Sequence, residues 1–152
     1  MTLPTILLPG DGKSVVMGNS SCTFKVTGKD THGHFGLFEF SLAPETGGAS
    51  LHIHKQMVEI FYVLAGEVEL TLGERTLVAG PGTVMTVPEN TPHGFSNPSP
   101  QPAKLLIMFC PDNSREKYFE GIAELRKDGR QPSQEELQAW ARQFDQYPAD
   151  EA

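Results

Sequence analysis

The residues most able to do chemistry are three histidines and a glutamate in the middle of the chain. His52 and His54 lie in the segment SLHIH, where they alternate with Leu51 and Ile53. Successive residues of a β-strand face opposite sides and rise about 3.3 Å each, so both imidazoles leave one face and can converge on one ion. The pair is therefore a candidate chelate.

Glu59 is the candidate carboxylate ligand, five positions after His54. On an unbroken strand this odd offset would direct the carboxylate away from the two histidines. A turn or bulge at Lys55-Gln56-Met57 would correct the parity. The sequence therefore predicts a break in strand register at that point.

His93 is the fourth candidate, in the segment GTVMTVPENTPHGFSN, where one strand runs into Pro88 and the next begins after a turn. Pro92 restricts Thr91 to an extended conformation and so helps to direct the following imidazole. Three nitrogens and one carboxylate oxygen suit one divalent transition-metal ion and leave positions open for water or substrate. Fe, Mn, Co, Ni, Cu and Zn all fit this donor set, so the sequence does not select among them.

The elements that must position these ligands are short strands. Residues 14–110 form β-type runs separated by Gly, Pro, Asn and Asp. Ten runs are expected to be strands: SVVM, CTFKV, HFGLFEF, SLHIH, VEIFYVL, EVELTL, RTLVA, TVMTV, HGFSN and AKLLIMF. Tight turns such as Ala65-Gly66 and Gly73-Glu74 favour antiparallel pairing, so the chain is predicted to be an all-β sandwich or barrel.

Two helices are predicted after residue 111. Asn113 and Glu116 resemble a capping box that opens the segment KYFEGIAELRK, which Gly129 would end. A second helix is expected from Ser133, with Glu136 at its third position. Its apolar residues recur at helical spacing: Leu137, Trp140, Ala141 and Phe144. We expect a barrel over residues 1–112 and a helical extension over 113–152 that packs on it.

The ligand spacing resembles the two sequence motifs of the cupin family. The first motif is matched by His52, His54, Glu59 and Gly66, and the second by Gly82, Pro88, His93 and Asn97. Together the motifs span about residues 47–97, a third of the chain, and their joint occurrence is more specific than either alone. The resemblance implies a double-stranded β-helix, or jelly roll, with one metal ion on the four ligand positions.

Two positions depart from the family pattern. Thr46 stands where the first motif usually has glycine, although Gly47 and Gly48 follow it, and Asn90 replaces the glycine after Pro88. Asn tolerates the left-handed conformation that such a turn needs, so the fold is not put in doubt.

The four ligands have a structural alternative. The histidines could be hydrogen-bonded core residues of a barrel without metal, and Glu59 could be a surface charge. Cupins that have lost the metal tend to replace a ligand, whereas His52, His54, Glu59 and His93 are all present. We therefore favour metal binding.

Within the cupins, the short single-domain form with an FKVTG strand and a helical tail is similar to the bacterial quercetin-dioxygenase-like group. The resemblance implies a metal-dependent dioxygenase for a small organic substrate, with phenols among the candidates and Glu59 as general base. A metal-dependent isomerase, epimerase or hydrolase and a non-catalytic binding protein remain open. Sugar-nucleotide chemistry would need basic residues in the cavity to bind phosphate, and no Arg or Lys occupies an inward-looking strand position.

The composition limits the classes of partner that the protein is expected to bind. The formal net charge is −7, without a run of Lys and Arg, so neither nucleic acid nor a membrane surface is expected to bind. No basic segment precedes the apolar N-terminal residues, which Pro4 and Pro9 interrupt, so we expect a cytoplasmic protein. A small molecule is the expected ligand.

Other candidate groups have simpler interpretations. Cys22 and Cys110 are expected to be reduced thiols in that compartment. His32 and His34 form a second HxH pair in KDTHGHFG, which is typical of a turn, so they are expected to be solvated.

The segment VEIFYVL is apolar on both faces, with Phe61 and Val63 facing in beside Glu59 and with Ile60 and Tyr62 facing out. A strand of this kind is usually covered on both sides, so we expect a homodimer. The large apolar candidates for the cavity wall are Phe24, Phe35, Phe40, Phe61, Met85, Phe95, Met108 and Phe109. Most of them are expected to be ordinary core residues, and some to shape a pocket beside the metal.

Overall fold

The computed structural model describes residues 3–152, which form two β-sheets and two α-helices. The strands are β1 (Lys13–Met17), β2 (Ser20–Val26), β3 (Gly36–Leu42), β4 (Thr46–Ile53), β5 (Val58–Ala65), β6 (Val68–Leu72), β7 (Arg75–Ala79), β8 (Val84–Val87), β9 (His93–Asn97), β10 (Ala103–Cys110) and β11 (Tyr147–Pro148). The helices are α1 (Arg115–Leu125) and α2 (Gln134–Arg142), with 3-10 turns at Lys127–Gly129 and Ala149–Glu151. All ten predicted strands are confirmed, and β11 is an addition.

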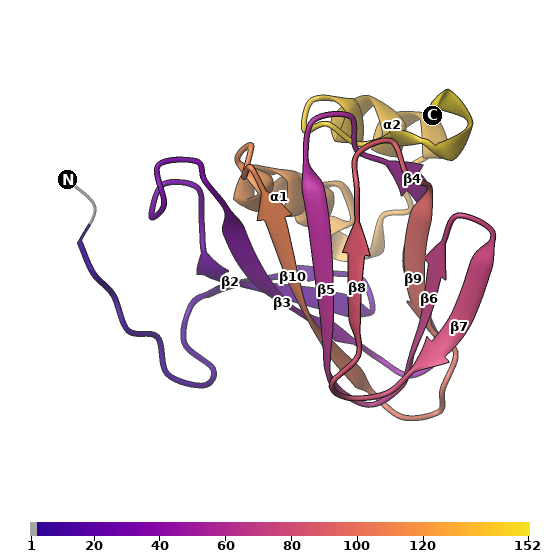
Figure 1. Ribbon diagram of the computed structural model, residues 1–152, viewed down its shortest axis with the longest axis horizontal. Coiled ribbons are helices and arrows are strands. Elements are labelled where there is room, and N and C mark those ends of the chain that lie inside the picture. The colour runs from indigo at the N-terminus through magenta and orange to yellow at the C-terminus, as the bar shows by residue number, and fades with distance from the viewer. Residues whose placement is uncertain (1–2) are drawn as a thin grey trace.

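The strands pair into two antiparallel sheets. One has the order β1-β2-β3-β10-β5-β8 and the other the order β11-β4-β9-β6-β7. Figure 1 shows the sheets curling around a shared interior, with α2 and the C-terminus above one end of the barrel. This is the jelly-roll arrangement, so the predicted fold class is confirmed.

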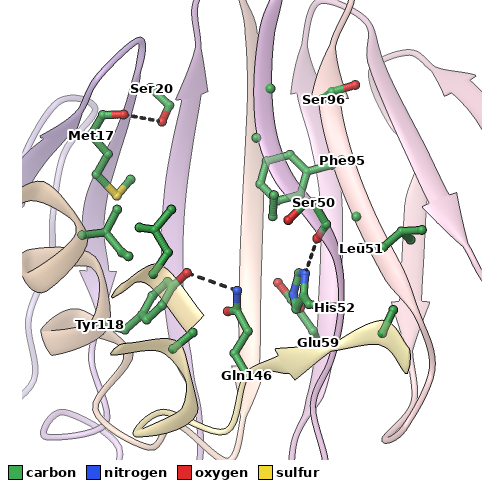
Figure 2. A pocket seen from close by; sticks show the side chains of 18 of the residues that line it. Met17, Ser20, Ser50, Leu51, His52, Glu59, Phe95, Ser96, Tyr118 and Gln146 are labelled. Atoms are coloured by element: carbon green, nitrogen blue, oxygen red, sulfur yellow. Dashed lines mark hydrogen bonds and ion pairs between the residues drawn. The ribbon is translucent and has the colours of Figure 1, made fainter. Parts of the chain in front are cut away.

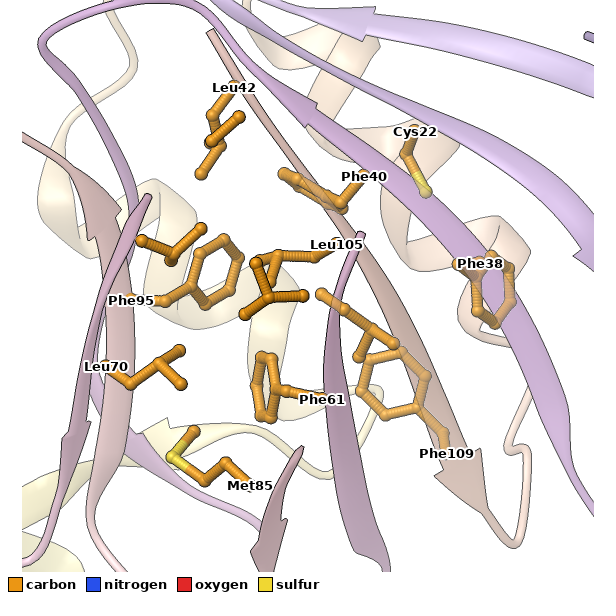
Figure 3. Close-up of a cluster of buried hydrophobic side chains, with 14 of the residues drawn as sticks. Cys22, Phe38, Phe40, Leu42, Phe61, Leu70, Met85, Phe95, Leu105 and Phe109 are labelled. Atoms are coloured by element: carbon orange, nitrogen blue, oxygen red, sulfur yellow. The ribbon is translucent and has the colours of Figure 1, made fainter. Parts of the chain in front are cut away.

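The interior between the sheets is filled by aromatic and aliphatic side chains (Figure 3). Alternate residues of β3 and β10 are buried, as a strand with one face on the core requires. Phe95 of β9 lies 5.5 Å, between ring centroids, from both Phe40 of β3 and Phe61 of β5. These contacts join the two sheets, and each fully buried ring contributes about 1.5–3 kcal/mol of transfer free energy.

The predicted break in register is confirmed as a change of sheet. β4 ends at Ile53 in one sheet, and β5 begins at Val58 in the other. The four residues between them have no strand conformation. Glu59 is consequently buried on the inner face of β5 together with Phe61 and Val63.

The two helices differ in how well they were predicted. The capping box of α2 is confirmed, because Ser133 Oγ accepts from the backbone N–H of Glu136 and the Glu136 carboxylate accepts from the N–H of Ser133. The capping box of α1 was wrong. Its N-cap is Ser114, which makes no side-chain cap, and Asp112 Oδ1 instead accepts from the N–H of Arg115 at 2.8 Å.

Asp112 displaces the expected cap because it also accepts from the N–H of Gly28 at 2.6 Å and so ties α1 to the barrel. α1 ends at Leu125, before the expected Gly129, which lies in the following 3-10 turn. Phe119 and Ile122 of α1 belong to the same buried cluster as the barrel residues. The boundary proposed at residue 112 stays a prediction. No helix within residues 3–152 is long and apolar enough to span a membrane.

Candidate metal centre

The structure brings the four predicted ligands together. One ligand atom from each of His52, His54, Glu59 and His93 lies within 4.8 Å of the others, and all four residues are buried. Glu59 Oε2 is 2.6 Å from His93 Nε2, 2.8 Å from His54 Nε2 and 3.9 Å from His52 Nε2. The three Nε2 atoms therefore converge on one carboxylate oxygen.

Three elements position these groups. His52 on β4 is paired directly with His93 on β9, which brings their ring centroids to 4.2 Å. Glu59 comes from β5 of the other sheet, and His54 lies in the segment where the chain changes sheet. Asn90 has a φ of 57°, as expected for the residue that replaces glycine in the turn before His93.

The backbone fixes the orientation of all three imidazoles. Their Nδ1 atoms lie 2.8 Å from Ser50 O for His52, 2.6 Å from Asp145 O for His54 and 2.8 Å from Thr91 O for His93. Because a carbonyl oxygen only accepts, each Nδ1 must carry a proton, and the neutral ring has its lone pair on Nε2. With neutral rings, three lone pairs and a carboxylate then point at one another, an arrangement that a metal cation between them would stabilise.

The charge states suit a metal ion. Burial, helped by the neighbouring His93 ring, lowers the pKa of His52 to about 3, so this imidazole is neutral and free to bind metal. Burial alone would raise the pKa of Glu59, but its contacts with His54 and His93 outweigh burial and hold that pKa well below the usual range. A donor set of three neutral imidazoles and one carboxylate fits a divalent transition-metal ion at bond lengths of about 2.0–2.2 Å.

The segment from Phe144 to Pro148, termed the C-terminal clamp below, holds the site from outside. Asp145 accepts from His54 through its backbone carbonyl, and its carboxylate accepts from the N–H groups of Lys55 and Gln56 at 3.0 and 2.8 Å. Asp145 has a φ of 58° and is buried. β11 then pairs with β4 at Ile53 and His52. Sequence analysis missed the clamp because it has neither strand alternation nor helical spacing.

Comparisons with known proteins agree with this geometry. The family model of the cupin domain matches residues 38–109. A sugar phosphate isomerase described as a cupin superfamily member, from Silicibacter pomeroyi, superposes with a TM-score of 0.62 at 19% identity, over 70% of this chain and 75% of that one. Residues 38–109 of the chain are therefore a cupin domain.

Two further proteins are similar to this cupin, one in its structure and the other in its sequence. The polyketide cyclase RemF from Streptomyces resistomycificus shares the fold, with a TM-score of 0.64 and 22% identity over 78% of this chain and 94% of that one. Quercetin 2,3-dioxygenase of Bacillus subtilis (strain 168) is 35% identical over 96 residues, which are 61% of this chain and 27% of that enzyme. The cupin thus spans about a quarter of the length of the Bacillus protein.

A cavity of about 890 Å³ opens beside the metal centre. His52 and Glu59 line it, whereas the other two ligands lie behind them. Figure 2 shows these two residues on one side of the cavity and Tyr118 and Gln146 of the C-terminal region on the other. Ligands of the cupin would therefore approach the ion site between the barrel and the tail.

The predicted aromatic wall was partly correct. Phe40, Phe95 and Phe109 line the cavity. The other five candidates, Phe24, Phe35, Phe61, Met85 and Met108, do not line it. Phe24, Phe61 and Met85 are buried in the hydrophobic core. Phe35 and Met108 are half-buried.

Basic residues of the cavity were missed altogether. Arg115 and Arg126 line it, and both belong to α1 or its C-cap rather than to a strand. The spacing of a helix gives no sign that a polar residue at its end faces a cavity.

The remaining candidate groups lie outside the ion site. His32 and His34 are exposed in a turn, as predicted. Cys22 and Cys110 are free thiols. Burial raises the pKa of both, which makes Cys22 in the core an inert packing residue.

Proposed function

We propose that this cupin is a metal-dependent dioxygenase that acts on a small organic molecule, with phenols the favoured class. The observation that carries the proposal is the buried cluster of three histidines and Glu59, which faces an aromatic-walled cavity through His52 and Glu59. The similarity to the Bacillus quercetin 2,3-dioxygenase supports the choice of reaction. The proposed metal ligands are His52, His54, Glu59 and His93.

The chain's own groups would bind the ion and orient the substrate. When bound, a redox-active divalent ion supplies Lewis-acid activation of a substrate oxygen and electron transfer to O2. His52, His54 and His93 would hold the ion with rings fixed by backbone carbonyls. The aromatic wall formed by Phe40, Phe95 and Phe109 would exclude water and stack on the substrate.

Glu59 is the proposed general base. Its carboxylate is ionised, and its low pKa makes it a good ligand but a weak proton acceptor while it contacts the rings of His54 and His93. To take a phenolic proton, Glu59 must loosen one of these contacts, which would raise its pKa toward the usual range. Base catalysis by Glu59 is therefore tied to substrate binding.

An isomerase or epimerase is the second candidate. Arg115 and Arg126 line the cavity, so basic groups are present after all, and an ion could polarise a carbonyl without O2. A binding protein without catalysis is the third candidate. Oxygen consumption separates the first candidate from the other two.

A homodimer remains a proposal as well, supported by exposed apolar side chains. Tyr62 of β5 and Val84 of β8, on the outer face of one sheet, are 42% and 56% exposed. Ile6, in the N-terminal segment that runs away from the barrel in Figure 1, is 88% exposed. A cytoplasmic location and a small molecule as the ligand, in place of nucleic acid or a membrane, are proposed on the sequence grounds given above.

Elemental analysis of purified protein tests the metal site. We expect about one equivalent of a transition metal in the unmodified protein and its loss in His52→Ala and Glu59→Ala. The matched control is His34→Ala, which removes an exposed histidine and should leave the metal content unchanged. If the unmodified protein contains no metal even after reconstitution, the metal site is refuted. The protein would then be a barrel that binds a small molecule without metal.

Oxygen uptake then tests the reaction. The metal-loaded protein is offered quercetin, small phenols and 1,3-diketones in an oxygen electrode, with the metal-free protein as blank. Uptake that needs both metal and substrate supports the dioxygenase. Metal-dependent turnover without oxygen uptake would replace it with the isomerase.

A further inference from the structure

Arg115 is a buried cation in the cavity wall. It is the first residue of α1, and its side chain is 2% exposed. Among residues 3–152 no carboxylate forms an ion pair with its guanidinium. Burying a charge without an ionic partner costs free energy of folding. Such a residue is therefore retained where a ligand pairs with the charge or where function needs it.

The hydrogen bonds of Arg115 use only some of the N–H donors of its guanidinium group. Nη1 donates to Phe144 O at 3.1 Å and Nη2 donates to Gln146 Oε1 at 2.8 Å, which fixes the side chain against the C-terminal clamp. Nε is buried without an acceptor among the described residues. A guanidinium has five N–H donors, so this one keeps capacity for a further acceptor.

The guanidinium also lies close to the ion site. The ring of Phe109 is 4.5 Å from the Arg115 guanidinium carbon and 6.1 Å, between centroids, from the His54 ring. The neighbouring carbonyls of Phe144 and Asp145 accept from Arg115 and His54 respectively. One aromatic ring and one peptide unit thus separate the cation from the metal ligands.

The charge balance of the cavity favours a negative ligand. The charged side chains that line the cavity are Glu59, Glu69, Asp150, Arg115 and Arg126, so a divalent ion held by neutral histidines would bring the net charge to about +1. Arg126 lies eleven residues further on, about 16 Å along a helix, so a second guanidinium is not available beside Arg115. One cation of this kind matches a singly charged anion.

The shape of the site selects among anions. The Arg115 guanidinium lies 4.5 Å from the ring of Phe109 and 3.9 Å from that of Tyr118, so only its edge can accept a new partner. A planar carboxylate can pair with that edge in the plane of the fork. The walls beyond it are apolar and include Phe40, Phe119 and Ile107, which suit an aromatic body.

We propose that Arg115 makes this cavity specific for a small aromatic carboxylate. The carboxylate binds the edge of the guanidinium, and the other end of the molecule faces His52 and Glu59. The placement of that second end rests on the proposed function, whereas the carboxylate contact does not.

Calorimetric titration of the whole protein tests this proposal with 4-hydroxybenzoate and its neutral isostere 4-hydroxybenzamide. The protein is loaded with zinc, which cannot turn over oxygen, and is titrated in parallel without metal. We expect the acid to bind at least about tenfold more tightly than the amide in both forms, as a charge-assisted hydrogen bond provides. Equal affinities would overturn the proposal without the need for a variant.

Variants assign the preference to Arg115. Arg115→Met keeps an unbranched apolar stem but removes the guanidinium, and it should reduce the acid-to-amide ratio to about one. Arg75→Met, at an exposed arginine on β7, is the matched control and should keep the full ratio. If Arg115→Met does not fold, as circular dichroism would show, Arg115→Lys takes its place and should lower the ratio several-fold, because an ammonium lacks the planar fork.

Three outcomes would overturn the proposal. The preference for the acid could persist in Arg115→Met, in which case the metal selects the anion. The preference could be unchanged in Arg115→Lys, so that the fork is irrelevant. Phenyl phosphate could bind more tightly than 4-hydroxybenzoate in an Arg115-dependent way, which would make the ligand a phosphate. None of these readouts uses oxygen, so a failed oxygen-uptake experiment removes the dioxygenase and leaves this test intact.

Discussion

The ligand strands and the C-terminal clamp meet at the ion site and contribute different things to it. β4, β5, β9 and the segment between β4 and β5 supply all four donor atoms. The clamp supplies none, yet its Asp145 accepts from the His54 ring and from two backbone N–H groups of the connecting segment. The strands and their connecting segment provide the donor atoms, and the clamp orients one of them, the His54 ring.

The difference shows how a metal site is divided between local and distant parts of a chain. The Nδ1 atoms of His52 and His93 bond to carbonyls two residues before them, Ser50 within β4 and Thr91 just before β9. His54 lies where the chain leaves the sheet and has no such local acceptor, so its ring depends on Asp145. Groups outside the ligand set commonly fix ring orientation in this way.

The largest expected effect comes from removing the residue at which the two regions meet. His54→Ala deletes a donor and leaves the carbonyl of Asp145 without its partner. We expect stoichiometric metal to be lost and the free energy of unfolding to fall by about 3 kcal/mol, from the cavity and the unpaired buried groups. Elemental analysis and urea denaturation measure both. Full metal content in this variant would show that His54 is not a ligand.

A smaller effect is expected when the clamp alone is broken. Asp145→Ala keeps every donor but removes the carboxylate that accepts from Lys55 and Gln56, and it places alanine in a left-handed conformation. We expect metal affinity to fall about 10- to 100-fold and stability by about 2–3 kcal/mol. Competition with a chelator measures the affinity.

Asp145→Asn is the matched control for that experiment. Asparagine tolerates the left-handed backbone and keeps one side-chain acceptor, so its loss in affinity should be clearly smaller than that of the alanine variant. Equal affinities for the unmodified protein and Asp145→Ala would mean that the barrel orients His54 without the clamp.

The smallest effect is expected in α2, which covers the barrel without touching a ligand. Ser133→Ala removes the capping box and should lower stability by about 1 kcal/mol. Metal content should stay at the level of the unmodified protein. A loss of metal here would show that the whole tail, and not only the clamp, controls the site.

Most of the barrel and all of the donor set could be predicted from the sequence. Strands with one buried face alternate, so their extents follow from the side-chain pattern. The odd spacing between His54 and Glu59 was enough to predict the break, because parity on a strand is fixed. The capping box at Ser133 could also be predicted, because both of its hydrogen bonds join residues three positions apart.

The features that escaped prediction depend on contacts between distant segments. Asp112 replaces the expected cap of α1 because it also binds Gly28, which lies 84 residues earlier. β11 has two residues, one of them Pro148, and so carries no alternation. Arg115 resembles any charged residue at a helix start until α1 is placed against the cavity. Such features have no local signature.

The bond between His54 and Asp145 also sets an order of events during synthesis. The carbonyl that fixes the His54 ring is 91 residues further along the chain. When the ribosome has released only the ten strands of the barrel, two of the three imidazoles can be held and the third cannot. The His54 ring can therefore be fixed only after residue 145 has emerged, so the proposed metal site is completed late in synthesis.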